Sequence, residues 1–401
     1  MVKSFPMKKG LNRFLFLTSI FLLTPIIVRG QEENTPENLK KWELNGYIKD
    51  MVSLNFTPDS TLVDNLIHNR LNFKWYPNEN LSIVVEMRNR IFTGDLVKSI
   101  PQYSSFIDTN NDYFDLSVIP LDKNNLVMHS MIDRAYVEWT NEHWEIRAGR
   151  QRINWGTNVV WNPNDLFNAY SFFDFDYEER PGSDALRVTK YIGFASSVEV
   201  AVKMADHHSN LVAAGLWKFN QWNYDFQLLS GVANGDFTLG AGWAGNIGNA
   251  GFKGEMTYFT PYENTPGVNT AFLGAFTVDY SFGNSSYLLG SYLFNSDGVT
   301  SLNTQSTFLL SNQTLTARNL MPFRHSTIIQ YSYQVHPLIN TSLAIMNFPG
   351  DNALFINPGI SMSMTKNLDL SLISQFFLNE DINNDYKAIA KLLFTRIKWS
   401  F

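Results

Sequence analysis

The chain has 401 residues, a net charge of −6, 14% aromatic residues and no cysteine. The absence of cysteine excludes disulfide cross-links, iron–sulfur clusters and cysteine-ligated zinc. The acidic balance argues against a nucleic-acid partner, because binding to phosphates depends on lysine and arginine.

Residues 1–30 have the composition of a cleaved secretory signal peptide. A basic beginning is followed by an apolar run over residues 14–28, which ends at Val28-Arg29-Gly30 before Gln31. A membrane anchor is the alternative, but a run of about fifteen residues that contains Pro25 is short for a helix that needs about twenty. Cleavage takes away five basic residues and leaves 26 basic and 37 acidic residues, a net charge of −11.

Residues 31–41 are expected to be a short periplasmic segment, and residues 42–401 carry a different pattern. From Trp42 onward, apolar and polar residues alternate in segments of about ten to fifteen residues. Residues 71–76, 81–91 and 331–335 are clear examples. A period of two predicts β-strands with two unlike faces, and helical spacing is sustained nowhere.

Short and longer connections alternate along the chain, which predicts 18 strands, with 16 as the next possibility. Short turns at one rim and long loops at the other are typical of transmembrane antiparallel β-barrels of the bacterial outer membrane. A soluble sandwich is the alternative, although its turns need not sort by length. The short connections are 77–80, 141–143, 191–194, 219–221, 247–249, 283–285, 336–340 and 366–367, and the longer ones are 57–64, 93–128, 155–184, 205–209, 231–236, 260–267, 295–322, 349–351 and 380–385.

Aromatic residues gather at strand ends, as expected where a barrel meets the two membrane interfaces. They are Trp75, Trp139, Trp217, Trp222, Tyr280 and Tyr287. The last strand ends at Phe401 and resembles the signal that the barrel-assembly machinery recognises, so this machinery is an expected partner, as are outer-membrane lipid and lipopolysaccharide. The expected location is the outer membrane of a Gram-negative bacterium.

Closing 16 to 18 strands leaves an interior too wide for side chains to fill, so an aqueous lumen is expected. If Leu71, Val85 and Val137 face lipid, the alternating charged residues face this lumen. Strands eight to thirteen, which include residues 239–246, 274–282 and 287–294, present few inward charges. A charged wall opposite a neutral wall would select solutes or brace the barrel. The predicted pore-lining residues are Arg70, Lys74, Glu86, Arg88, Arg90, Arg134, Glu138, Glu145, Arg147, Arg396 and Lys398.

Residues 155–184 form a connection that is too long and too aromatic for an ordinary loop. We predict that it folds into the lumen and pairs with inward arginines as a constriction; a surface loop packed on its own aromatics is the alternative. A bulge at Gly149 would turn the arginines beside it inward, and Asn162 and Pro163 predict a capped helical turn. The predicted constriction residues are Arg150, Arg152, Trp155, Asp165, Asp174, Asp176, Glu178, Glu179, Arg180 and Arg187.

One segment also carries a resemblance. Gly149-Arg150-Gln151, Trp155-Gly156 and Asn162-Pro163-Asn164-Asp165 resemble the G-R-Q, W-G and N-P-x-D segment of porin-like outer-membrane barrels related to the alginate-export family. The resemblance covers about forty residues closely, and it implies a porin-like protein of a Bacteroidetes-type bacterium. It does not transfer a substrate, because here acids balance the arginines.

Three functions compete. The first is a channel for passive diffusion of small polar or anionic solutes. The second is a plugged, non-conducting barrel that binds or assists export, and the third is an outer-membrane hydrolase, for which the seven scattered histidines give little support. No catalytic, cofactor or metal site is predicted: residues 108–112 begin like a calcium loop but lack the glycine and glutamate of an EF-hand. The sequence specifies neither the solute nor the oligomeric state.

Overall fold

The computed structural model describes residues 40–108, 112–170, 182–263, 268–299, 315–350, 352–380 and 385–401. Within these ranges nearly all of the chain is β-strand, and the strands belong to one antiparallel sheet. The strands are β1 (Trp42–Phe56), β2 (Thr61–Asn78), β3 (Leu81–Gly94), β4 (Ser117–Lys123), β5 (Leu126–Thr140), β6 (Trp144–Gln151), β7 (Ser183–Tyr191), β8 (Ser197–Lys203), β9 (Val212–Gln221), β10 (Tyr224–Ala233), β11 (Asp236–Ile247), β12 (Ala250–Pro261), β13 (Ala271–Ser281), β14 (Ser286–Asn295), β15 (His325–His336), β16 (Ile339–Phe348), β17 (Ala353–Thr365), β18 (Leu368–Glu380) and β19 (Tyr386–Ser400).

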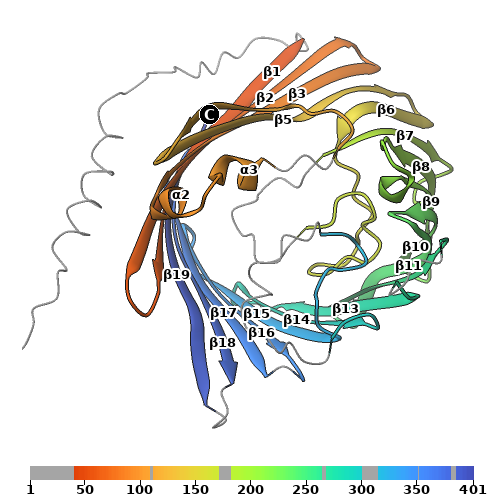
Figure 1. Ribbon diagram of the computed structural model, residues 1–401. Coiled ribbons are helices and arrows are strands. Elements are labelled where there is room, and N and C mark those ends of the chain that lie inside the picture. Colours follow the sequence, from red (N-terminus) through yellow and green to blue (C-terminus); the bar gives the residue numbers. More distant parts are fainter. Residues whose placement is uncertain are drawn as a thin grey trace, which may run out of the picture. The chain divides into compact units, whose positions relative to one another are not determined.

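The sheet closes on itself because β1 pairs with β19, from Tyr47 opposite Ser400 to Phe56 opposite Lys391. Strand β4 is not part of the closed wall: β3 pairs directly with β5, and β4 forms a hairpin on the outer half of β5. Eighteen of the described strands therefore form the ring in Figure 1, and the predicted 18-strand antiparallel barrel is confirmed.

The two faces of the wall follow the alternation of the sequence. Leu71, Phe73 and Val85 are 36%, 39% and 38% exposed on the outside. Between them, Arg70 and Arg88 point inward and are buried. An outside that is apolar and an inside that holds the charges match the surroundings of a barrel in a bilayer, where charge on the lipid face is costly.

The connections also sort mostly by length. Tight turns join β9 to β10 and β15 to β16 at one rim, where β1 begins and β19 ends. At the other rim, β10 and β11 are joined by only Asn234 and Gly235, both with positive φ, so this connection is as short as those of the first rim. The outer loop after β3 contains the helices α2 (Asp95–Ser99) and α3 (Tyr103–Ile107), and the 3₁₀ turn η2 (His208–Asn210) follows β8. None of the described helices has the length and apolar character needed to cross a membrane.

The aromatic residues at the short-turn rim mostly face outward, as predicted. Trp75, Trp139 and Trp217 are exposed near this end of β2, β5 and β9. Tyr287 is a correction: it shares the face of Leu289, which is buried inside the barrel, and it packs against the inner apolar cluster. Its position one residue from the exposed Leu288 places it in the lumen and not in the outer girdle.

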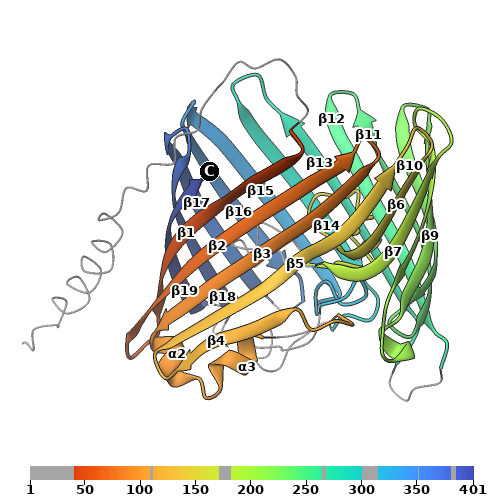
Figure 2. The ribbon, with the colours of Figure 1, turned by 90° about the horizontal axis from the view of Figure 1, so that it is seen from above.

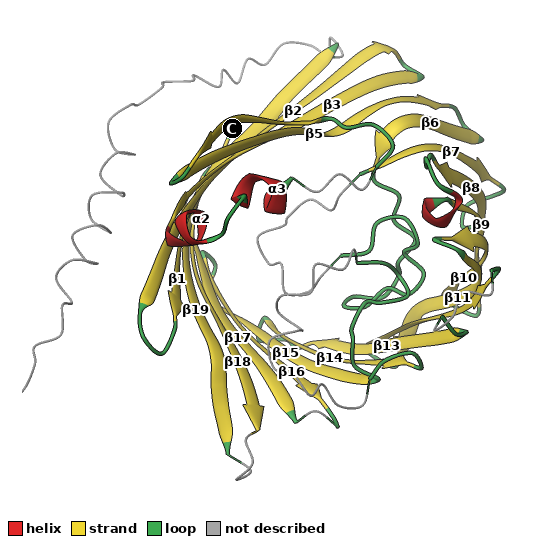
Figure 3. Cartoon of the chain, in the orientation of Figure 1, coloured by secondary structure: helices red, strands yellow, loops and turns green. Residues whose placement is uncertain are grey.

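Two outer connections run back into the ring, as Figures 1 and 3 show. Residues 152–170 and 315–324 bring apolar side chains against inner side chains of β7 to β18, and together they form a hydrophobic cluster inside the barrel. Arg318 fastens the second segment through ion pairs to Asp236 (2.9 Å) and Asp297 (3.0 Å). The loop members of the cluster are Ile153, Trp155, Val160, Trp161, Leu166, Phe167, Ala317, Leu320, Met321 and Phe323.

Candidate functional site: a charged wall and an anchored loop

The charged wall, defined as the inner face of β19, β1, β2, β3, β5, β6 and β7, is organised around Arg70. This side chain is completely buried on β2. Its guanidinium forms ion pairs with Asp133 and Glu86 and donates to Asn72 Oδ1 at 2.9 Å. Arg88 lies 3.5 Å from the second oxygen of Asp133. These several contacts are needed, because removing two charges from water costs free energy. A buried ion pair recovers that free energy only when further hydrogen bonds satisfy both partners.

Asp133 lies at the centre of this network, and the predicted pore-lining set did not include it. Glu86 is opposite Arg134 and Met87 is opposite Ile132, so Asp133 is an extra residue in β5. A β-bulge of this kind lets two consecutive residues share one face of a strand. The sequence signal is a break in the alternation of apolar and polar residues along β5. Ile132 and Val137 both face outward, although strict alternation would place an even-numbered and an odd-numbered residue on opposite faces.

A second network follows on β5, β6 and β7. Arg147 forms ion pairs with Glu138 and Glu145, and Arg187 forms a further pair with Glu145. The Arg147 guanidinium also lies 4.7 Å from the centre of the Tyr136 ring. These predicted residues are therefore brought together, and their charges alternate along the wall.

The wall contains a further cation that the predicted set did not include. Lys49 on β1 is completely buried, and its Nζ lies 5.5 Å from the centre of the Tyr47 ring. Lys398 on β19 approaches the same ring at 4.6 Å. On β2, Lys74 lies 4.9 Å from the Tyr76 ring, which places it toward the short-turn rim. Lys49 is two residues from Tyr47, so the two side chains share the inner face of β1, and Lys49 lies opposite Lys398 of β19. These two facts would have identified Lys49 as a residue of the inner wall.

The outer end of the charged wall is covered by the loop between β3 and β5. Arg90 Nη2 lies 3.0 Å from His129 Nδ1, and His129 Nε2 lies 3.1 Å from Asp108 of this loop. Tyr103 of α3 packs edge-on against Phe92, with ring centres 5.7 Å apart. Burial raises the pKa of Tyr103 to about 12, so this residue is a neutral phenol at physiological pH.

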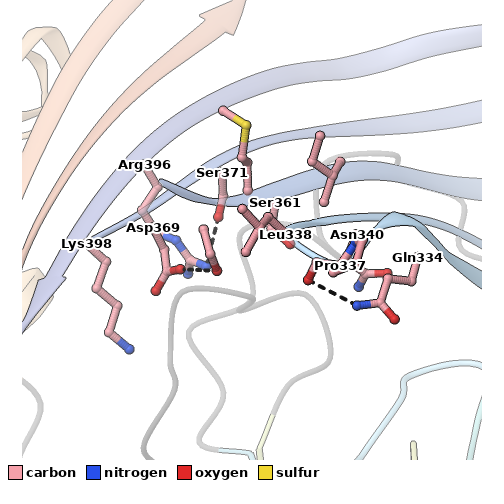
Figure 4. Close-up of a pocket in the computed structure, with 12 residues that line it drawn as sticks. Gln334, Pro337, Leu338, Asn340, Ser361, Asp369, Ser371, Arg396 and Lys398 are labelled. Carbon is pink, nitrogen blue, oxygen red and sulfur yellow. Dashed lines mark hydrogen bonds between the residues drawn. The ribbon is translucent and has the colours of Figure 1, made fainter. Parts of the chain in front are cut away.

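At the short-turn end, the charged wall opens into a hollow of about 380 Å³ between β15 and β19. Figure 4 shows Arg396, Lys398 and Asp369 on one side of it and Asn340 and Gln334 on the other. Arg396 donates weakly to Ser371 Oγ at 3.5 Å. The remaining lining residues are Pro337, Leu338, Ile339, Ser361, Met362 and Ser363.

The opposite wall is not as neutral as predicted, because Glu255 on β12 points inward and is only 1% exposed. Its Oε1 accepts the backbone N–H groups of Thr157 and of Asn158 (2.7 Å), and its Oε2 accepts the N–H of Asn164 (2.9 Å). Lys253 and Asp279 pair on the same wall at 3.1 Å. In the sequence, Glu255 is an isolated acid among mostly uncharged residues of β12. That isolation could have identified it as a residue with a specific partner inside the barrel.

The loop of residues 152–170 is held in part by acids of the wall. Trp155 Nε1 donates to Glu199 on β8, and Gln227 Nε2 on β10 donates to the Trp155 carbonyl oxygen at 2.8 Å. Glu199 and Glu255 therefore accept hydrogen bonds from the described part of the predicted constriction, and the pairing of its acids with inward arginines stays a prediction. The backbone N–H groups of the loop and the Trp155 indole N–H are hydrogen-bond donors, and the carboxylates of Glu199 and Glu255 are acceptors.

The motif of the sequence resemblance has a local structural explanation. A Cβ on Gly156 would lie 2.3 Å from Asn162 Oδ1, so any other residue at position 156 would displace the Asn162 side chain. Asn164 is completely buried, accepts from Thr257 Oγ1 at 2.7 Å and donates to the Ala241 carbonyl oxygen at 3.0 Å. The buried Asp165 donates its N–H to the Asn162 carbonyl oxygen at 3.1 Å, which closes a single turn in place of the predicted helical turn.

The predicted arginines near Gly149 have different surroundings. Gly149 has a φ of +119°, in the region that favours glycine, and a Cβ there would lie 2.2 Å from the Ala135 carbonyl oxygen. Arg150 forms a two-pronged ion pair with Asp184 at 2.8 Å and donates to the Phe114 carbonyl oxygen, so it joins β6, β7 and an outer loop. Arg152 is half-buried. The other predicted constriction acids and base, Asp174, Asp176, Glu178, Glu179 and Arg180, lie outside the described residues.

The calcium-like sequence is only partly described, since residues 109–111 lie outside the described ranges. Asp112 forms an ion pair with Lys203 at 3.0 Å, and Asp108 accepts from Ser117 Oγ at 2.6 Å as well as contacting His129. Across the described part of the chain, no cluster of three or more histidine, aspartate or glutamate side chains could hold a metal ion.

No protein-family model matches the sequence, and no curated protein matches it. Solved structures of outer-membrane porins share the fold. OccAB4 of Acinetobacter baumannii is 10% identical, with a TM-score of 0.56 over 92% of this chain and 100% of that one. OccAB2 of the same organism is 8% identical, with a TM-score of 0.54 over 90% and 98% of the two chains. OccK11 of Pseudomonas aeruginosa is 8% identical, with a TM-score of 0.54 over 90% and 96%. At these identities the likeness shows the fold alone.

Proposed function

We propose that this protein is a porin-like channel of a bacterial outer membrane through which small polar or anionic solutes diffuse. The proposal is supported by the closed barrel with its apolar outside, by the charged wall inside, and by the fold that the chain shares with porins. The resemblance of residues 149–165 to barrels related to the alginate-export family agrees with it. We propose no enzymatic activity.

One observation carries the proposal: the inserted loops pack mainly on apolar inner faces, whereas the ion-pair networks around Arg70 and Arg147 lie on the charged wall. Residues 152–170 and 315–324 pack in one cluster with apolar inner side chains of β7 to β18. The proposed solute path therefore runs on the side of the charged wall and reaches the hollow at Arg396 and Lys398. A transverse field of fixed charges selects among polar solutes. The paired acids on this wall favour small solutes over polyanions.

Planar lipid bilayers test conduction directly. The purified protein is expected to insert in discrete conductance steps, because a path along fixed charges is hydrated. A folded protein that stays silent, and remains silent after deletion of residues 157–182, would contradict the channel. That outcome would favour a plugged binding or export-accessory barrel, for which the tight anchoring of the loop by Glu255 is the specific supporting observation.

Removing a positively charged side chain at the hollow near the short turns should make the channel more permeable to cations relative to anions. A charge about 8 Å from the path contributes about 0.5 kcal/mol in water. Lys398→Ala and Arg396→Ala are therefore each expected to change the chloride-to-potassium permeability ratio about twofold. Reversal potentials in a salt gradient measure this ratio. Lys190→Ala is the matched control, because Lys190 lies against Trp144 near the same rim and shares the outward face of Val188. Equal effects of all three variants would argue against a path at the hollow.

Cellular location and assembly follow from the same proposal. We infer export by a cleaved signal peptide at residues 1–30, and insertion by the barrel-assembly machinery through the last strand. The end of that strand is paired: the N–H of Phe401 donates to the Gly46 carbonyl oxygen at 3.0 Å, and the Phe401 carbonyl oxygen accepts from Gly46 at 3.1 Å. The Phe401 ring contacts Trp399, with centres 5.2 Å apart, on the outward face where lipid would contact it, and lipopolysaccharide would contact the opposite, long-loop end of the barrel.

A further inference from the structure

Four successive turns at the short-turn rim carry large apolar side chains that are exposed. They join β7 to β8, β9 to β10, β11 to β12 and β13 to β14, and Figure 2 shows this rim at the top of the view. Phe194 at the first turn is fully exposed, Trp222 at the second is 80% exposed, and Ile247 and Phe282 at the next two are exposed as well. We call these four the apolar turns. The β15–β16 turn is not included, because its Leu338 lines the hollow of the charged wall.

The described turns beside the charged wall differ from the apolar turns in chemistry but not in depth. The tips of these turns are Glu79-Asn80, Glu142-His143 and Lys366-Asn367. Glu79 follows the exposed Trp75 by four residues, and Trp222 follows the exposed Trp217 by five residues. Strands rise about 3.3 Å per residue and are tilted by about 40°, so both tips lie about 10 to 13 Å beyond these tryptophans of the girdle. At a similar depth, the rim is therefore charged on one side of the ring and apolar on the other.

The apolar turns continue rows of side chains that face lipid. Ile247 has the same parity as the exposed Leu239 of β11, and Phe282 has the same parity as the exposed Val278 of β13. The outward positions between them hold no charged residue: they are Ala241, Trp243 and Gly245 on β11, and Tyr280 on β13. The lipid-facing surface therefore reaches the rim at these turns without interruption.

The polar residues of the apolar turns suit lipid headgroups. Residues 191–197, 219–224, 246–250 and 281–286 include no aspartate or glutamate. The exposed polar side chains there include the amides of Asn223, Asn249 and Asn284. An apolar body with a polar group beside it is typical of side chains at a bilayer interface. A negatively charged headgroup repels a carboxylate, so the lack of acids in these segments fits the same environment.

We propose that the apolar turns are embedded in the phospholipid leaflet at the short-turn rim, whereas the turns beside the charged wall stay in water. Lipid is the occupant because the four apolar side chains stand on separate turns along an arc of the ring. A bilayer surface follows such an arc, and it also meets the lipid-facing rows that lead to the turns. Embedding one side of the rim inclines the barrel axis toward that side. The inference rests on the membrane location in the proposed function, but it does not depend on conduction.

Because the chain has no cysteine, a single introduced cysteine reports on one position. Asn249→Cys places a label on an apolar turn and Glu142→Cys places it on a turn beside the charged wall, and both native side chains are exposed. The label is a nitrobenzoxadiazole group, whose emission shifts to shorter wavelengths away from water, and the protein is reconstituted in phospholipid vesicles. A phospholipid with a spin label near its headgroup should quench the label at residue 249 about threefold more than the label at residue 142. Both residues lie at the same rim, so the orientation of the barrel in the vesicle does not affect the comparison.

A second set of variants tests whether the apolar side chains cause the contact. In the Asn249→Cys background, Phe194→Glu together with Trp222→Glu should lower the quenching about threefold, because a carboxylate is costly to remove from water. His143→Glu together with Lys366→Glu, on the turns beside the charged wall, is the matched control and should leave the quenching unchanged. Migration on unheated gels verifies that each barrel is folded.

Equal quenching at residues 249 and 142 would overturn the proposal. Emission at residue 249 that is shifted but not quenched by the lipid would also overturn it, since protein would then cover the turn. Val200→Cys, at an outward position on β8 that is 51% exposed, reports membrane insertion, and an unquenched label there would contradict the membrane location itself. Quenching at residue 249 of a protein that is silent in bilayers would leave the proposal standing while contradicting the channel.

Discussion

Glu255→Ala should release the inserted loop and raise single-channel conductance. In the wild-type protein the carboxylate accepts three backbone N–H groups of residues 157–164, and it does so where water is excluded. A buried donor that loses its acceptor costs about 1–3 kcal/mol, so three donors cost about 3 kcal/mol or more. The released state should gain about 100-fold in population, seen as larger conductance steps in planar bilayers.

Limited proteolysis gives an independent readout, because a released loop should be cleaved between residues 152 and 170, where the anchored loop is protected. Asp279→Asn is the matched control: Asp279 lies on the same inner wall and pairs with Lys253. If Glu255→Ala and Asp279→Asn have the same conductance and the same cleavage rate as wild type, Glu255 does not hold the loop.

Arg70→Ala is expected to be the most destabilising single change in the charged wall. The substitution leaves Asp133 and Glu86 without the guanidinium that neutralises them, and Asp133 is buried. Breaking a buried ion pair by removing one partner costs about 3–5 kcal/mol. Urea unfolding in lipid vesicles, followed by the mobility of the folded barrel on unheated gels, measures this change.

The companion variants distinguish an ion-pair effect from lost packing. Arg70→Met with Asp133→Leu removes both charges, so it should recover most of the stability that Arg70→Met loses. Lys74→Met removes a cation from the same face of β2, where the side chain is only partly buried, and should cost less than about 1 kcal/mol. Equal losses in Arg70→Met and in the double variant would show that the charges of this pair do not stabilise the barrel.

The barrel could be predicted from the sequence because its signal is local. A strand in a bilayer has one face in lipid and the other toward the lumen, so a period of two is imposed on every segment. The exposed Leu71 and Val85 and the buried Arg70 and Arg88 follow that parity directly. Turn residues then mark the ends of the strands, which gives the number of strands in the ring.

Alternation along the sequence wrongly predicts which side chains face the lumen where the strands do not pair regularly. Asp133 was missed because a bulge in β5 changes which of its residues face inward. The position of that bulge depends on how β5 pairs with β3, and a single sequence does not show this pairing. Tyr287 was assigned to the outer girdle because an aromatic residue near a strand end suits either face. Its neighbour Leu289, buried by the inserted loops, shows that it faces the lumen.

The sequence by itself determined the strands, their two faces and the presence of a long loop with an unusual motif. Only the tertiary structure decided where that loop binds, since Thr157 and Asn158 contact Glu255 almost a hundred residues later in the chain. It also decided that Arg70, Glu86 and Asp133 form one network, because pairing between strands sets their register. Alternation is a property of each strand, whereas these contacts depend on how distant strands are brought together by closure of the barrel.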